Sequence, residues 1–285
     1  MVTEIENAIR YDLSSPSWGN HQDLKIILCI IKTYGMLNIV FIGTAGCGKT
    51  SLTHVFGKWL EHELDAEISY VNLDPGVHRT PYVPSYDVRE LITVERLMEH
   101  GLGPNGAMIR AAEIIEEKIS EVSRRVYDLK SDFKLIDTPG QMELFLFRSM
   151  GPRFVEEISK HVPTVSVYII DPALASTLSG LAISFLLPMI TRLRLGVPVV
   201  SVINKADLPE IYKVEEFSRD LRNLKEKMVS EEKGLIVDLA SRFIELVDEF
   251  SKTIRIVKTS AKTEEGMDDL YTLIREALCE CGDLM

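Results

Sequence analysis

A glycine-rich segment that ends in lysine and threonine is the strongest chemical feature of the sequence. Residues 43–50 read GTAGCGKT, which fits the pattern G-x-x-x-x-G-K-[ST]. Glycines let the backbone curve around a phosphate with its N–H groups pointing inward, and a following helix adds partial positive charge. We expect Lys49 to reach the β- and γ-phosphates and Thr50 to bind Mg²⁺. The expected phosphate-binding residues are Gly43, Ala45, Gly46, Cys47, Gly48, Lys49, Thr50 and Ser51.

A second motif lies at residues 137–141, where the sequence DTPGQ fits D-x-x-G. We expect the Asp137 carboxylate to hold the magnesium shell and the backbone N–H of Gly140 to sense the γ-phosphate. Gln141 could orient an attacking water. By itself the motif is weak, because an Asp-Gly turn after a strand is common.

A third motif, NKAD at residues 204–207, indicates the base of the nucleotide. The Asp207 carboxylate can accept hydrogen bonds from N1–H and the 2-amino group of guanine, and adenine offers neither donor. Lys205 can lie over the base, and Asn204 can tie this loop to the phosphate loop. The later segment Ser260, Ala261 and Lys262 resembles a loop that contacts guanine O6. The four motifs together predict GTP or GDP as the bound nucleotide.

These motifs need strands to position them, and β-branched apolar runs predict such strands. The expected strands are Leu37–Ile42, Glu67–Leu73, Asp132–Ile136, Thr164–Ile170, Val197–Ile203 and Ile254–Lys258. Helical patterns between them cover residues 49–63, 106–129, 142–160, 178–194, 212–229, 234–250 and 266–280. This alternation predicts an α/β fold with a doubly wound, mostly parallel sheet, whose ligand lies at the carboxyl ends of the strands.

The connection at about residues 74–131 is longer than a simple crossover requires, so we expect an insertion there. It contains a proline-rich stretch, a short helix near residues 91–100 and one long helix. The long helix carries an apolar stripe that should pack on the core. Its members are Ala111, Ile115, Ile119, Val122, Val126 and Leu129.

Composition limits the other functions that the chain could have. The 285 residues include 32 Lys and Arg against 43 Asp and Glu, for a formal net charge of -11. This balance argues against non-specific nucleic-acid binding and against docking on anionic membranes. Four cysteines are too few for a disulfide scaffold. Acidic residues near the N-terminus argue against a signal peptide, and no apolar run is long enough to span a membrane. We expect a cytoplasmic protein with no membrane or direct nucleic-acid partner.

With these motifs in place, Gly103-Pro104-Asn105 makes the chain resemble the GPN-loop GTPase family over about residues 36–280. The strings NLDPGV at 72–77, GPNGA at 103–107 and DTPGQME at 137–143 carry the resemblance. It implies a P-loop NTPase fold of the dimerising GTPase class. It also implies a homodimer in which the Gly103-Pro104-Asn105 loop enters the other subunit's site, where Asn105 approaches the γ-phosphate. By the same resemblance, Asp74 faces magnesium and the water, and Gln141 and Glu143 position that water.

Several alternatives remain open at the level of sequence. The chain could be a P-loop kinase, or an assembly chaperone whose GTP is structural and hardly hydrolysed. Asn105 could simply cap a helix beginning near Gly106, because Asn is a favoured N-cap. The eukaryotic relatives help to assemble RNA polymerase, so the resemblance implies an unidentified protein client. Residues 1–35 precede the resemblance, either as a true N-terminal extension of a domain at 36–285 or as sequence upstream of a natural start at Met36.

Overall fold

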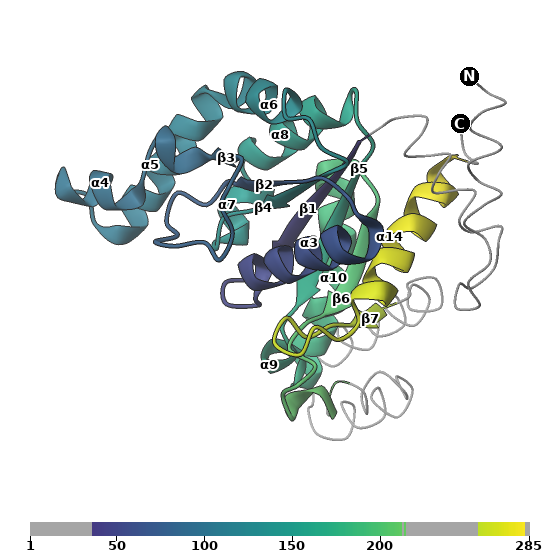
Figure 1. Cartoon of the computed structure of the whole chain (residues 1–285). Coiled ribbons are helices and arrows are strands. Elements are labelled where there is room, and N and C mark those ends of the chain that lie inside the picture. Colours follow the sequence, from purple (N-terminus) through teal and green to yellow (C-terminus); the bar gives the residue numbers. More distant parts are fainter. Residues whose placement is uncertain (1–35, 213, 215–255, 283–285) are drawn as a thin grey trace, which may run out of the picture. The chain divides into compact units, whose positions relative to one another are not determined.

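The computed structural model describes residues 36–212, 214 and 256–282. In this part of the chain a seven-stranded sheet has the order β3-β2-β4-β1-β5-β6-β7 (Figure 1). The strands are β1 (Leu37–Gly43), β2 (Ile68–Asn72), β3 (Tyr86–Asp87), β4 (Phe133–Asp137), β5 (Thr164–Ile170), β6 (Val199–Ile203) and β7 (Ile256–Lys258). Every pairing between these strands is parallel. The predicted α/β class is therefore confirmed, with a sheet that is wholly parallel rather than mostly so.

Helices cover both faces of this sheet, as a central parallel strand requires. All seven residues of β1 are buried, which explains why that strand reads as a continuous apolar run. Phe41 meets Phe56 of α3 edge to face, whereas Val40 and Ile42 join the core cluster on the opposite face. The helices in the described part of the chain are α3 (Lys49–Leu64), α4 (Val94–Glu99), α5 (Pro104–Glu117), α6 (Ile119–Tyr127), α7 (Met142–Leu146), α8 (Met150–Ser159), α9 (Pro172–Ala175), α10 (Leu178–Leu195) and α14 (Met267–Gly282), with a 3₁₀ turn η1 at Val88–Glu90.

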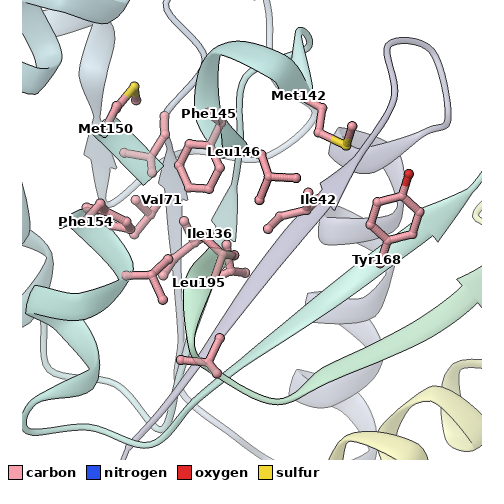
Figure 2. Packing of buried hydrophobic residues seen from close by; sticks show 14 of the residues in the cluster. Ile42, Val71, Ile136, Met142, Phe145, Leu146, Met150, Phe154, Tyr168 and Leu195 are labelled. Carbon is pink, nitrogen blue, oxygen red and sulfur yellow. The ribbon is translucent and has the colours of Figure 1, made fainter. Parts of the chain in front are cut away.

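One part of the core fixes the chain that follows Asp137. Ile42, Val71 and Ile136, from three neighbouring strands, pack beneath Phe145 of α7 and Phe154 of α8 (Figure 2). Burying a large aromatic side chain contributes roughly 1.5–3 kcal/mol. Because α7 begins directly after the DTPGQ segment, this packing holds Gly140 and Gln141 close to the carboxyl end of β4.

The insertion differs from its prediction in two respects. The expected long helix at 106–129 is broken at Lys118 into α5 and α6. Outside the insertion, the expected helix at 142–160 is likewise two helices, α7 and α8. The apolar stripe nevertheless stays buried across the first break, from Ala111 to Val126, because both helices pack on the same core. The two-residue strand β3 was not predicted. It pairs with β2 and extends the sheet edge into the insertion.

Some expectations lie outside the described residues. They include the N-terminal extension at 1–35, nearly all of the helix at 212–229, the helix at 234–250 and the first residues of the last strand. Among the helices that the structure does describe, none combines the length and apolar character that crossing a membrane requires.

Candidate nucleotide site

The glycine-rich loop joins β1 to α3 at the middle of the sheet. Gly46 and Gly48 have positive φ values of 78° and 93°, which glycine adopts without a Cβ penalty. The Lys49 ammonium donates to the carbonyl oxygens of Gly43 at 2.9 Å and Thr44 at 3.0 Å. The loop is thus already curved, with its one lysine charge held inside the curve.

The two glycines of this loop give a direct test of its geometry. A Cβ at Gly48 would overlap Nδ2 of Asn204, whereas a Cβ at Gly46 would meet nothing within 4 Å. We expect Gly46→Ala to lower the free energy of unfolding by about 1–2 kcal/mol through backbone strain alone. Gly48→Ala should cost more and also weaken nucleotide binding at least about tenfold, because Asn204 must move. Chemical denaturation and nucleotide titration of both variants measure this difference, and equal effects would contradict it.

Asp137 ends β4 and is 1% exposed. Its Oδ2 accepts a hydrogen bond of 2.8 Å from the Tyr82 hydroxyl, while its Oδ1 has no hydrogen-bond partner among the described residues. Burial raises the pKa of Asp137 to about 6, although the hydroxyls of Thr50 and Tyr82 and the Lys49 ammonium act in the opposite direction. Burial and the adjacent Asp137 carboxylate raise the pKa of Tyr82 far above its usual range, so its hydroxyl remains a donor.

This carboxylate suits magnesium held mainly by a nucleotide. Mg²⁺ prefers oxygen ligands and usually keeps several waters, with one or two carboxylates and substrate phosphates completing its shell. A buried oxygen of Asp137 without a partner fits that demand. Within the described residues no group of three or more His, Cys, Asp or Glu side chains could form a cage made by protein alone. Thr50 and Asp137 are therefore the residues that would hold the ion, with Asp74 nearby.

Asp74 begins the insertion and lies directly against the DTPGQ segment. Its Oδ2 accepts a hydrogen bond of 2.8 Å from the backbone N–H of Gly140, and its Oδ1 accepts one of 2.8 Å from Gly76. Asn72 fixes the turn, since its Oδ1 accepts from the Asp74 N–H at 3.0 Å. The Gly140 N–H expected to sense a γ-phosphate thus donates to Asp74 here, so a phosphate must replace that carboxylate.

At the other side of the phosphate loop, the NKAD segment contacts both neighbouring motifs. Asn204 donates from Nδ2 to the Cys47 carbonyl at 3.0 Å, which is the expected tie to the phosphate loop. Asp207 accepts from the Ser260 hydroxyl at 2.8 Å, and the Lys262 ammonium lies 3.7 Å from its other oxygen. The hydrogen bond from Ser260 lowers the pKa of Asp207, with Lys262 acting in the same direction. The carboxylate is therefore charged and ready to accept donors from a base.

Two residues that hold these groups, Asp171 and Tyr82, were not predicted from the sequence. Asp171, at the end of β5, accepts from the Lys205 ammonium at 2.8 Å, and Lys205 itself has a positive φ of 61°. The position of Asp171 at the end of a strand, directly before Pro172, could have indicated a site residue. Tyr82 had no such signal, because its partner Asp137 is 55 residues away.

The arginines of the insertion take different positions. Arg89 forms a two-pronged ion pair with Asp87 and donates to the carbonyls of Val77 at 3.1 Å and His78 at 3.0 Å. Burial by itself would raise the pKa of Asp87. The hydrogen bonds from Arg89 lower this pKa by more, so the net shift is downward. Arg89 therefore fastens the loop after Asp74 to the sheet edge, while Arg79 is exposed.

Three expected catalytic side chains are exposed. Gln141 precedes α7 as its N-cap residue, and Glu143 lies in the first turn of that helix. Asn105 is the second residue of α5, whose N-cap is Gly103 with Pro104 at the first helical position. The alternative that Asn105 caps a helix starting near Gly106 is therefore wrong. No hydrogen bond in the described chain joins the side chain of any of the three to another expected site residue.

Comparisons with known proteins decide the family. A family model described as "Conserved hypothetical ATP binding protein" matches residues 41–280. The GPN-loop GTPase PAB0955 of Pyrococcus abyssi is 39% identical over 253 residues, covering 86% of this chain and 99% of that protein. The chain belongs to the GPN-loop GTPase family. GPN-loop GTPase 1 of Saccharomyces cerevisiae is 29% identical, and the match spans 66% of that protein.

A solved structure agrees with this membership of the GPN-loop GTPases. The crystal structure of PAB0955, described as a GTPase in apo form, superposes with a TM-score of 0.76 at 37% sequence identity. The match covers 86% of this chain and 98% of that one. The family resemblance expected from the motifs is thereby confirmed, together with the fold that positions them.

Proposed function

We propose that this GPN-loop GTPase binds GTP with Mg²⁺ and hydrolyses its β–γ anhydride, and that it works as a nucleotide-timed switch. The observation that carries the proposal is the contact set around Asn204 and Asp207. Asn204 ties the NKAD segment to the phosphate loop at Cys47, and Ser260 orients the Asp207 carboxylate. One nucleotide can thus lie with its phosphates on the loop and its base at Asp207.

The base preference follows from hydrogen-bond chemistry. The description of the matching family model names ATP, whereas the relatives are named GTPases. A charged carboxylate is an acceptor only, and guanine presents two adjacent donors, N1–H and the 2-amino group. Adenine presents an unprotonated N1 there, which sets an acceptor against the carboxylate and costs about 1–3 kcal/mol or more relative to guanine. Guanine is therefore the favoured base.

In the proposed reaction a water attacks the γ-phosphate in line. Lys49 exchanges the Gly43 and Thr44 carbonyls for phosphate oxygens, and the loop N–H groups meet the developing charge. Asp74 leaves Gly140 and turns with Gln141 and Glu143 toward the water, so that the freed Gly140 N–H donates to the γ-phosphate. Mg²⁺ held through Thr50 and Asp137 would neutralise charge between the β- and γ-phosphates.

The proposed working unit is a homodimer in which Gly103-Pro104-Asn105 of each subunit completes the other's site. The exposure of the start of α5 supports this, since residues 101–106 are all exposed. The apolar side chains of Met98, Leu102 and Ile109 nearby are 42%, 38% and 41% exposed, and a second copy would cover them. By family resemblance, the dimer would act in the cytoplasm on a protein client in assembly of a larger complex such as RNA polymerase.

A competition experiment tests the nucleotide and the reaction together. Binding of fluorescent GTP to the full chain should be displaced by GTP and GDP, while ATP should need a concentration at least about 100-fold higher. Phosphate release should require Mg²⁺ and stop in EDTA. Equal displacement by ATP, or transfer of the phosphate to an acceptor, would favour a P-loop kinase instead. Tight GTP binding with no measurable release would favour a chaperone with structural GTP.

A further inference from the structure

We propose that Tyr82 is a positioning residue, whose hydroxyl orients the Asp137 carboxylate toward the magnesium of the bound nucleotide. This inference rests on the proposed function, because it concerns the same site. It assigns a task to a residue of the insertion that none of the nucleotide-binding motifs contains.

The hydrogen bond from Tyr82 gives the two oxygens of the Asp137 carboxylate different surroundings. The Tyr82 hydroxyl donates to Oδ2 at 2.8 Å, and both side chains are buried, with Tyr82 5% exposed and Asp137 1% exposed. Oδ1 has no hydrogen-bond partner in the described chain. A buried carboxylate oxygen without a partner is costly, so it needs a ligand that arrives with the nucleotide. Because Tyr82 occupies one oxygen, the other is held in a single orientation.

Aromatic packing in turn fixes Tyr82. Its ring stacks on Tyr70 of β2 at a centroid distance of 4.7 Å and an interplanar angle of 12°, and the His54 ring of α3 lies 6.3 Å away. The Thr80 hydroxyl donates to the Tyr82 carbonyl at 2.8 Å, which holds the backbone. The hydroxyl is therefore presented by a side chain that cannot turn away without breaking these contacts.

Tyr82 belongs to a loop of the insertion that contacts the candidate site at two points. Tyr82 lies between Asp74 and strand β3, in the segment that Arg89 also fastens at Val77 and His78. The segment thus contacts the site at Asp74 and at Asp137. Removing the hydroxyl should take from Oδ2 its hydrogen bond with Tyr82, and the carboxylate should then hold magnesium less well.

Tyr82→Phe removes only this hydroxyl and keeps the stacked ring. Tyr70→Phe is the matched control, since its hydroxyl belongs to the same stack but donates to the His54 carbonyl at 3.4 Å, away from Asp137. Fluorescent GDP binding to the full chain is titrated with Mg²⁺ and repeated in EDTA. We expect Tyr82→Phe to raise the Mg²⁺ concentration for half-saturation about tenfold, as for the loss of one hydrogen bond to a charged group. GDP affinity in EDTA should match the wild type, and Tyr70→Phe should match it in both conditions.

Three results of the Mg²⁺ titration distinguish a positioning role of Tyr82 from the proposed GTPase function. If the wild type binds GDP with Mg²⁺ dependence and Tyr82→Phe has the same dependence, Tyr82 has no positioning role while the proposed function stands. If Tyr82→Phe weakens binding equally in EDTA, its role is structural and the inference is wrong. If the wild type shows no Mg²⁺-dependent binding of guanine nucleotides, both the proposed function and this inference fail.

Discussion

Replacing Asp207 with asparagine should change the base that the protein selects from guanine to xanthine. In the proposed site the carboxylate accepts from two guanine donors, whereas an asparagine amide would place an NH₂ group against the 2-amino group of guanine. Xanthine has a carbonyl at that position, which can accept from the amide. We expect GTP affinity to fall on the order of 100-fold, because one hydrogen bond to guanine is lost and the other no longer goes to a charged acceptor, and xanthosine triphosphate to become the better ligand.

Competition binding with GTP, xanthosine triphosphate and ATP measures this change. Asp207→Ala is the control variant, since it removes the acceptors without supplying a donor and should lose GTP without gaining the xanthine nucleotide. Unchanged selectivity in Asp207→Asn would remove the guanine assignment.

Asn105→Ala should retain GTP binding and lose most of its turnover. Asn105 is exposed, Gly103 caps its helix, and no hydrogen bond of the Asn105 side chain occurs within the described chain. The substitution should therefore leave the thermal midpoint nearly unchanged. Loss of one group that stabilises transition-state charge costs roughly 100- to 1,000-fold in rate. Single-turnover hydrolysis measures this loss, and Arg110→Ala, a surface change about one and a half turns further along α5, is the control. A normal single-turnover rate in Asn105→Ala would contradict the proposed role.

Mixing variants tests whether Asn105 acts on the other subunit. Lys49→Ala destroys its own phosphate loop but carries an intact Asn105, whereas Asn105→Ala carries an intact phosphate loop. In a mixed dimer, one site would combine the intact loop of one subunit with Asn105 of the other. An equal mixture should recover about a quarter of wild-type turnover per subunit, since half of the dimers are mixed. If Asn105 acts within its own subunit, the mixture should stay as inactive as each variant alone.

Motif order and strand pattern predicted the main features of the nucleotide site. Each of the four motifs follows an apolar run, and parallel strands bring their carboxyl ends to one edge of the sheet. The predicted contact of Asn204 with the phosphate loop is present because β6 and β1 both flank β5. Family membership could also be predicted, since Gly103-Pro104-Asn105 occurs together with the other motifs.

Local sequence patterns did not predict the element boundaries that depend on packing or on the residue preferences of a helix start. The apolar stripe from Ala111 to Val126 continues in phase across Lys118, so periodicity could not reveal the break between α5 and α6. Strand β3 has two residues, which is too short for any alternation. Asn105 was placed one residue before its helix, but Pro104 fits the first helical position, so the helix begins earlier.

The sequence by itself determined the glycine-rich loop, the NKAD segment, the succession of strands and the family, because each motif and each apolar run is a short stretch of neighbouring residues. The tertiary structure alone decided which side chains contact the expected site residues. Tyr82 reaches Asp137 across 55 residues, Asp171 reaches Lys205 across 34, and Asp74 reaches Gly140 across 66. These contacts depend on the adjacency of β2 with β4 and of β5 with β6, which pairs segments that no local pattern connects.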